Sequence, residues 1–221
     1  VGENGTGQIE NCDIFGNASS GIEIREGGNP VVQHCQIHDG KQNGVYVWKN
    51  GTGRIENCDI FANALSGIEI REGGNPVVQH CQIHNNKEGF GVAVGENGTG
   101  QIENCDIFGN AYSGILIAEG GNPVVQHCQI HDGKVSGVFV YENGTGQIEN
   151  CDIFGNGIGI GIMTGGNPVV QKCTIKKNAY QAVYVHDGGA GTIENGDLRD
   201  NAKGAWNIES GCQVRRSGNV E

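Results

Sequence analysis

The stretch IENCDIFGN, residues Ile9–Asn17, decides the fold because the chain repeats it in register. The same nine letters return at Ile102 and at Ile148. A close copy, IENCDIFAN, begins at Ile55, and a degenerate copy, IENGDLRDN, begins at Ile193. Self-similarity at a fixed period of about 20–50 residues is the mark of a solenoid or another repeat architecture.

The cysteines measure the period of this repeat. Eight of them are spaced 22 to 24 residues apart: Cys12, Cys35, Cys58, Cys81, Cys105, Cys128, Cys151 and Cys173. One further step of 23 residues reaches Gly196, inside the degenerate copy. The unit is therefore about 23 residues long, and nine units account for most of the 221 residues.

Short-period alternation of apolar residues within each unit indicates β-strands. Ile22 and Ile24 flank Glu23, and the next unit alternates in the same way around Tyr46. Glycine and asparagine punctuate these runs in the motifs GGNP and NGTG, which favour turns. No stretch has a sustained helical period. We therefore predict an all-β fold, a single-stranded right-handed parallel β-helix (solenoid) of about nine coils.

In such a solenoid, equivalent residues of successive coils stand in columns about 4.8 Å apart. The cysteines are expected to form one inward column. A second column, five residues after each cysteine, is expected to turn a left-handed corner, and its asparagine amides are expected to bond to their neighbours. This column contains Asn17, Gly40, Asn63, Asn86, Asn110, Gly133, Asn156, Asn178 and Asn201.

Units of the form I-x-x-[C/N]-x-I-x-x-N-x-x-x-G-I-x-I resemble the repeats of right-handed, pectate-lyase-like β-helix proteins. Two longer strings have a narrower resemblance. GNPVVQHCQIHDGKQNGVYVWKNGTG (Gly28–Gly53) and IENCDIFANALSGIEIREGGNP (Ile55–Pro76) resemble the β-helix region of F-box ubiquitin-ligase substrate receptors and related microbial repeat proteins. The first resemblance implies the β-helix fold, and the second implies recognition of a protein substrate.

The two ends of the chain differ in pattern. Val1–Ala18 recurs letter for letter at Val94–Ala111, so the chain is expected to begin in the middle of a coil. We predict one domain, a right-handed parallel β-helix of residues 1–202 with its N-terminus cut in mid-coil, followed by a C-terminal cap or transition segment at residues 203–221. The unpaired edge of an open first coil also predicts end-to-end self-association.

Composition and charge argue against several partners. The chain has 25 acidic and 14 basic residues, a formal net charge of −11, and no basic cluster. We therefore expect neither nucleic acid nor membrane as a partner. No signal peptide is visible, and many unpaired thiols favour a cytoplasmic or otherwise intracellular location. Asn-x-Ser/Thr sequons, which follow from the NGTG turns, leave secretion open.

Nine cysteines and three histidine pairs raise the question of a metal site. Eight cysteines stand in a line, which is neither a tetrahedral cluster nor good disulfide geometry, so we expect reduced, buried thiols with Cys212 outside the row. Pairs such as His34 and His38 mimic the HxxxH zinc motif, which requires a helix. His38 alternates with phenylalanines, which predicts aromatic stacking. We predict no metal and no cofactor.

Acidic residues recur every second coil, about 9.6 Å apart by the strand spacing. This separation is close to that of the carboxylates in inverting glycosidases. A catalytic pair, however, requires two carboxylates in different environments, and periodic copies share one environment. They indicate a solvated face, and we predict no catalytic residue.

Outward residues that differ between units are the best candidates for function, since the scaffold does not dictate them. They follow the pattern G-[IV]-x-[IV]-x, and the corner before that strand also varies, as at Tyr112, Val135 and Tyr180. Aromatic and arginine side chains on one long face anchor protein partners or stack on sugar rings; the alternative is cross-strand pairing that only stabilises the sheet. The predicted binding residues are Glu23, Arg25, Tyr46, Trp48, Glu69, Arg71, Phe139, Tyr141, Met163, Tyr184 and His186.

Three functions remain open from the sequence. The leading one is a non-catalytic recognition scaffold that binds a protein or peptide partner along the variable face. The second is a carbohydrate-binding or polysaccharide-cleaving β-helix, which as an enzyme would be a polysaccharide lyase or a glycoside hydrolase. The third is a purely structural repeat, natural or idealised, with no site.

Overall fold

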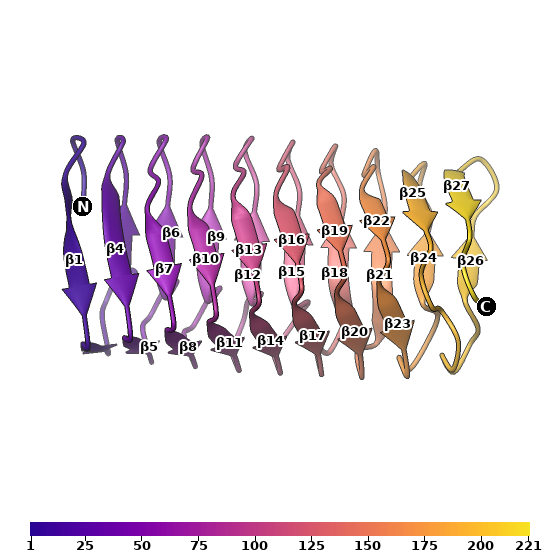
Figure 1. The fold of residues 1–221 in the computed structure, drawn as a ribbon, viewed down its shortest axis with the longest axis horizontal. Coiled ribbons are helices and arrows are strands. Elements are labelled where there is room, and N and C mark those ends of the chain that lie inside the picture. Colours follow the sequence, from indigo (N-terminus) through magenta and orange to yellow (C-terminus); the bar gives the residue numbers. More distant parts are fainter.

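The computed structural model describes all 221 residues as coils stacked along one axis (Figure 1). It contains 27 β-strands and no helix. The strands form three parallel sheets that run the length of the stack, which confirms the predicted all-β solenoid of about nine coils. The structure has no apolar helix of membrane-spanning length.

Successive coils add strands to the three sheets in the order that the repeat predicts, and after β23 the eight-stranded sheet continues only through isolated bridges at Asp197. The ten-stranded sheet contains β1 (Thr6–Glu10), β4 (Asn29–Gln33), β7 (Arg54–Glu56), β10 (Val77–Gln79), β13 (Gln101–Glu103), β16 (Val124–Gln126), β19 (Gln147–Glu149), β22 (Val169–Gln171), β25 (Ala190–Glu194) and β27 (Gln213–Ser217). The eight-stranded sheet contains β2 (Asp13–Phe15), β5 (Gln36–His38), β8 (Asp59–Phe61), β11 (Gln82–His84), β14 (Asp106–Phe108), β17 (Gln129–His131), β20 (Asp152–Phe154) and β23 (Thr174–Lys176). The nine-stranded sheet contains β3 (Ile22–Ile24), β6 (Val45–Val47), β9 (Ile68–Ile70), β12 (Val92–Val94), β15 (Ile115–Ile117), β18 (Ser136–Val140), β21 (Ile158–Ile162), β24 (Val183–Val185) and β26 (Trp206–Ile208).

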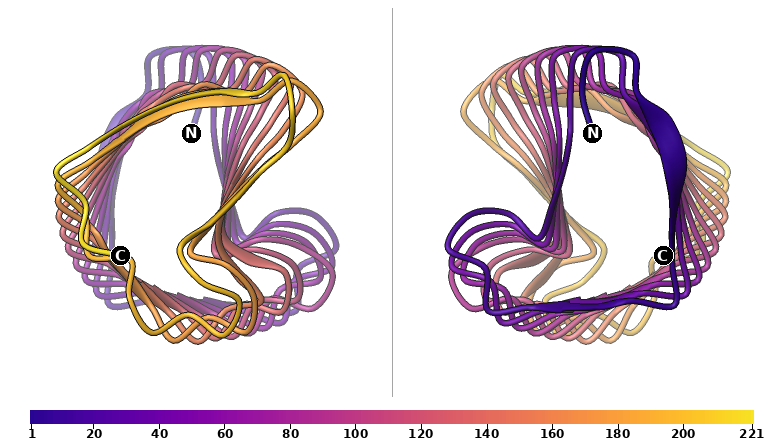
Figure 2. Two further views of the ribbon diagram at one scale, coloured as in Figure 1. Left: turned by 90° about the vertical axis from the view of Figure 1, so that its right-hand side faces the viewer. Right: turned by 90° about the vertical axis from the view of Figure 1, so that its left-hand side faces the viewer.

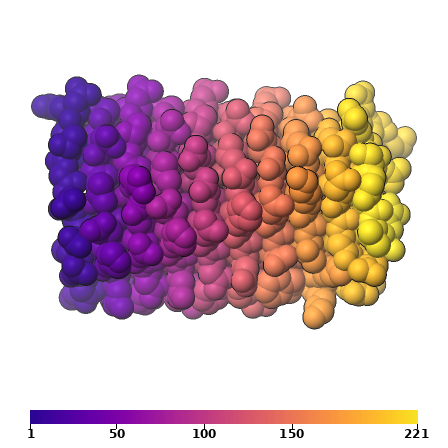
Figure 3. Space-filling view, in the orientation of Figure 1, coloured from indigo at the N-terminus to yellow at the C-terminus, as the bar shows by residue number.

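Strict register stacks like residues on like. Ile14 pairs with Ile37, and Ile37 pairs with Ile60. Viewed along the axis, successive coils surround one interior, each rotated a little from the last (Figure 2). A single cluster of 40 buried residues, almost all isoleucine, valine or cysteine, fills that interior. Side chains close the outer surface, where each coil forms one band (Figure 3).

The cysteine column lies inside, as predicted. Seven of the nine cysteines are buried, Cys12 in the first coil is exposed, Cys212 is half-buried, and all nine are free. Each buried thiol donates to a nearby carbonyl oxygen, as Cys81 Sγ does to Gln79 at 3.3 Å. Burial raises the pKa of the Cys35 thiol. These thiols act as small apolar residues that also satisfy backbone carbonyls.

The predicted corner column needs a correction. The left-handed residue is the one before the predicted position, as at Ala62 (φ 53°) and Asn85 (φ 53°), and not Asn63 or Asn86. The asparagines instead turn inward and form a buried ladder along the axis. Asn86 Nδ2 donates to Asn110 Oδ1 at 2.9 Å, which confirms the expected amide bonding.

The outer face of the eight-stranded sheet carries a continuous aromatic stack. Phe15, His38, Phe61, His84, Phe108, His131 and Phe154 follow one another with ring centroids 4.5 to 5.5 Å apart. Each histidine Nε2 lies 2.9 Å from an aspartate of the preceding coil, as His84 does from Asp59. The stacking prediction is confirmed, and these aspartates are ion-paired or hydrogen-bonded as well as solvated.

Residues 203–221 continue the solenoid. β26 pairs with β24 and β27 pairs with β25, so two of the sheets extend through this segment. Its role as a terminal cap stays a prediction.

Candidate functional site

The nine-stranded sheet brings all the predicted binding residues onto two adjacent outward columns. Alternate residues of each strand point into the core, so the middle residue of each three-residue strand, such as Glu23 in β3, points out. The first column contains Glu23, Tyr46, Glu69, Ala93, Leu116, Phe139, Gly161, Tyr184 and Asn207. The second column, directly after the strands, contains Arg25, Trp48, Arg71, Gly95, Ala118, Tyr141, Met163, His186 and Glu209.

At the N-terminal end of this face the aromatic groups are already engaged. Trp48 Nε1 donates to Glu23 Oε1 at 3.0 Å. The Tyr46 and Trp48 rings are parallel with centroids 5.6 Å apart, and Lys49 Nζ lies 4.1 Å from the centroid of the Trp48 ring. This part of the face therefore behaves as cross-strand pairing that stabilises the sheet.

The middle of the face is acidic. Arg71 contacts Glu69 at 2.8 Å, Glu96 at 2.7 Å and Glu119 at 3.8 Å. Although desolvation opposes it, the field of these three carboxylates raises the pKa of Arg71. One positively charged guanidinium thus pairs with three carboxylates, so the net charge of this region is negative.

Tyr141 stacks on Phe139 at 5.2 Å, beside that acidic region. Burial, with the nearby carboxylates of Glu142 and Glu119, raises the pKa of the Tyr141 phenol. The phenol therefore stays neutral at physiological pH. The next predicted residue, Met163, is half-buried.

A shallow pocket of about 350 Å³ lies at the C-terminal end of the face. Tyr180 stands on the corner before β24, is 47% exposed, and has Lys203 Nζ 4.4 Å from its ring centroid. Tyr184, on β24, lines the pocket from the sheet side. The complete lining is Ile158, Tyr180, Gln181, Tyr184, Lys203 and Asn207.

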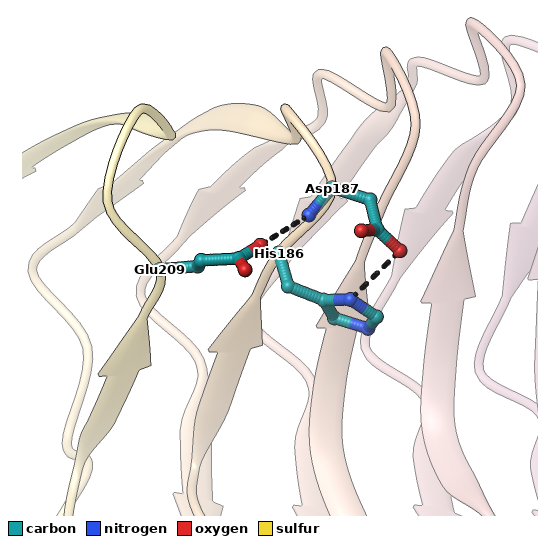
Figure 4. A group of neighbouring side chains, drawn as sticks. All are labelled: His186, Asp187 and Glu209. Carbon is teal, nitrogen blue, oxygen red and sulfur yellow. Dashed lines mark hydrogen bonds and ion pairs between the residues drawn. The ribbon is translucent and has the colours of Figure 1, made fainter.

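Next to this pocket, three ligand-type side chains meet: His186, Asp187 and Glu209 (Figure 4). His186 and Asp187 follow β24, and Glu209 follows β26 in the next coil. His186 Nδ1 lies 3.0 Å from Asp187 Oδ2, and the Asp187 backbone N–H donates to Glu209 Oε2 at 2.8 Å. The rings of Tyr184 and His186 have centroids 4.6 Å apart, so Tyr184 connects the pocket to this cluster.

Two other pockets of similar size are not lined by two aromatic side chains beside a cluster of ligand-type residues. One, of about 310 Å³, is lined by Asp152, Phe154, Thr174, Lys176 and Lys177. The other, of about 330 Å³, is lined by Asn57, Cys58, Asp59, His80 and Gln82. Neither has two aromatic walls. The C-terminal end of the nine-stranded sheet is therefore the best candidate site.

The sequence pattern predicts only part of this site, namely Tyr184, His186 and the variable corner residue Tyr180. Asp187, Glu209 and the amide and lysine groups that line the pocket are not among the predicted residues. The signal for Glu209 was its place in the second column, 23 residues after His186, but the decayed letter pattern from about Lys203 hid it.

Comparisons with known proteins agree with the fold. The family model described as "Right handed beta helix region" matches residues 1–99 and 88–220. No curated protein sequence matches the chain significantly.

Several solved structures share the fold at low identity. The periplasmic alginate epimerase AlgG is 14% identical, with a TM-score of 0.79 over 90% of this chain and 54% of its own. The A-module of the Azotobacter vinelandii mannuronan C-5 epimerase AlgE6 is 21% identical, with a TM-score of 0.72 over 91% of this chain and 63% of its own. The catalytic domain of a GH87 α-1,3-glucanase is 13% identical, with a TM-score of 0.80 over 96% of this chain and 49% of its own. The chain thus spans about half to two thirds of the length of these proteins.

These comparisons correct the leading expectation from the sequence. The leading prediction, a scaffold that binds a protein partner, was wrong, because the structural neighbours are carbohydrate-active enzymes. The narrower similarity to F-box receptors is also not supported. That similarity rested on turn glycines and alternating isoleucines, which any coil of this length requires. Stacked parallel coils and a family match over nearly the whole sequence lead to one conclusion: the chain belongs to the family of proteins with a right-handed β-helix region.

Proposed function

We propose that this chain binds polysaccharide, and that the pocket between Tyr180 and Tyr184 holds one sugar unit. The observation that carries the proposal is the composition of this pocket. Two tyrosine rings and Ile158 offer apolar walls, and Gln181, Asn207 and Lys203 offer hydrogen-bonding groups. Sugar rings present apolar C–H faces and a rim of hydroxyls, so this is the mixture that they require.

The neighbouring face supports an extended ligand. Phe139, Gly161 and Tyr184 pair in register across three neighbouring strands. The outward columns therefore run without interruption from Tyr184 to Phe139 and Tyr141. The carbohydrate chemistry named for the structural neighbours is consistent with a polymer that lies along this sheet.

Charge narrows the class of polysaccharide. Glu69, Glu96 and Glu119 share one arginine, and Glu142 lies one coil further towards the pocket. A polyuronate along this face would face uncompensated carboxylates, whereas carboxylates accept hydrogen bonds from neutral sugar hydroxyls. The ligand that fits best is therefore an uncharged polysaccharide.

Affinity electrophoresis and calorimetry would test this proposal with a soluble uncharged α-glucan, an uncharged β-glucan and alginate. We expect one of the uncharged glucans to bind, with an affinity that changes little between low and high salt. Tyr184→Ala and Tyr180→Ala should each weaken binding about tenfold, equivalent to about 1.4 kcal/mol.

Phe15→Ala is the matched control. Phe15 is 62% exposed but lies on the eight-stranded sheet, so its loss should leave the affinity unchanged. Equal effects of Phe15→Ala and Tyr184→Ala, or no binding to any of the three polymers, would reject the site. Tyrosine-dependent binding to alginate would keep the site and overturn the charge argument.

A further inference from the structure

His-Asp dipeptides occur three times in the chain, in two different settings. In His38–Asp39 and His131–Asp132, the ring Nδ1 contacts the following aspartate at 2.9 and 2.8 Å. Their Nε2 atoms contact Asp13 and Asp106 of the preceding coil, each at 2.9 Å. The two carboxylates therefore bind opposite nitrogens of one ring and cannot converge on a single point.

The third dipeptide, His186–Asp187, is arranged differently. Its second carboxylate comes from Glu209 in the following coil, and one ligand atom from each of the three residues lies within 4.8 Å of the other two. Figure 4 shows the three side chains turned towards one region on the outside of the sheet. Here the carboxylates of Asp187 and Glu209 flank the His186 side chain from two sides (Figure 4).

Backbone contacts hold the cluster in place. The Glu209 N–H donates to the Val185 carbonyl at 2.9 Å, which sets Glu209 one coil from His186 in the same column. The Asp187 N–H then donates to Glu209 Oε2 at 2.8 Å, which directs the carboxylate back towards the dipeptide. Backbone hydrogen bonds between coils, just beyond the ends of β24 and β26, therefore determine the separation of these residues.

We propose that His186, Asp187 and Glu209 bind a divalent transition-metal ion, with Zn²⁺ the best match. One imidazole nitrogen and two carboxylate oxygens are ligands that Zn²⁺ accepts at about 2.0–2.2 Å. Asp187 and Glu209 are exposed, so side-chain rotations can bring the three ligand atoms, which lie within 4.8 Å of one another, to such distances from one ion. Ca²⁺ fits poorly, because it takes six to eight oxygen ligands. A fourth position faces solvent, so the ion would keep a water ligand.

This proposal is independent of sugar binding, and its test contains no polysaccharide. Calorimetry with ZnCl₂ would use the untagged full chain carrying Cys12→Ser and Cys212→Ser, because these are the two cysteines that are not buried. We expect one Zn²⁺ per chain. His186→Ala and Glu209→Gln should each weaken its binding by about tenfold or more.

His131→Ala is the matched control, because it removes the same dipeptide in the other setting and should leave the affinity unchanged. If His186→Ala does not fold, Glu209→Gln and Asp187→Asn decide the question, since both preserve size. Unchanged Zn²⁺ affinity in these variants, or Zn²⁺ binding only when Cys12 and Cys212 are present, would overturn the proposal.

Discussion

Asn178 Nδ2 donates to Asn201 Oδ1 at 2.9 Å, and the same oxygen accepts the Asn178 backbone N–H at 3.0 Å. One side chain thus satisfies two buried donors of the previous coil. The asparagine ladder is therefore a longitudinal connection between coils, in addition to the sheets.

The ladder predicts a large cost for Asn178→Ala. The substitution removes the acceptor for the Asn156 backbone N–H and the donor to the Ile153 carbonyl, both of which are buried. Unsatisfied buried groups should lower the free energy of unfolding by at least about 2 kcal/mol, measurable by urea denaturation. Asn17→Ala is the control, because Asn17 occupies the same column in the first coil and makes no side-chain hydrogen bond. A similar loss for both variants would show that the ladder does not stabilise the coils.

A second prediction concerns the column of glycines at the start of the nine-stranded sheet's strands, which includes Gly44 immediately before β6. A Cβ on Gly44 would lie 2.6 Å from Ile60 Cγ2 and 2.7 Å from the Gly67 carbonyl oxygen. Gly44→Ala should therefore destabilise the protein by about 1–3 kcal/mol.

At one place the chain itself has alanine in this glycine column, together with a second substitution that relieves the clash. Ala182 replaces this glycine where Leu198, which has no Cγ2 methyl, replaces the isoleucine of the next coil. Ile60→Leu should consequently recover part of the stability that Gly44→Ala loses. A double-mutant cycle would measure this coupling; additive losses would mean that the backbone contact alone causes the strain.

The third prediction is a pH dependence at His38. The hydrogen bond to Asp39, followed by that to Asp13, raises the pKa of His38 above its ordinary value, because both stabilise the protonated ring. The resulting stabilisation is fully present below about pH 6.5 and is lost as the pH rises through the higher folded-state pKa.

The melting temperature of the wild type should therefore exceed that of His38→Gln most at acidic pH, and the difference should shrink above neutrality. In an NMR titration, Asp39→Asn should lower the pKa of His38. A difference in melting temperature that grows with pH would contradict this assignment.

The fourth prediction concerns thiol reactivity. Cys12 is exposed, Cys212 is half-buried, and the other seven cysteines are buried. A disulfide reagent added to the native protein should modify Cys12 quickly and Cys212 more slowly, and the rest only after unfolding. Cys12→Ser should remove the fast phase alone. Rapid modification of more than two thiols would mean that the inward column is open to solvent.

Letter patterns were sufficient for the repeating part of the structure. Every coil of about 23 residues fills the same interior with the same apolar positions, so Ile14, Cys35 and their copies could be assigned to the core without coordinates. The outward position of Tyr184 and His186 followed from the same alternation, since neighbouring residues on a strand face opposite sides.

The corner was the point at which the prediction from the pattern was wrong. The pattern assigned the left-handed conformation to Asn63, because asparagine tolerates it better than most residues do. The structure gives the positive φ to Ala62 and turns Asn63 inward, where its oxygen accepts the Gly40 backbone N–H at 3.1 Å. Satisfying a buried donor in the adjacent coil determined this choice, against the local preference of asparagine for the left-handed region.

The sequence by itself therefore determined the coil, its period and the face on which variable residues lie. Only the tertiary structure decided which of those residues form a site. Ile158, Tyr184 and Asn207 line one pocket, and Glu209 joins His186, because strand register places residues from successive coils side by side. From about Lys203 the letter pattern decays, so the register that brings Asn207 and Glu209 beside the preceding coil can be read only from the folded chain.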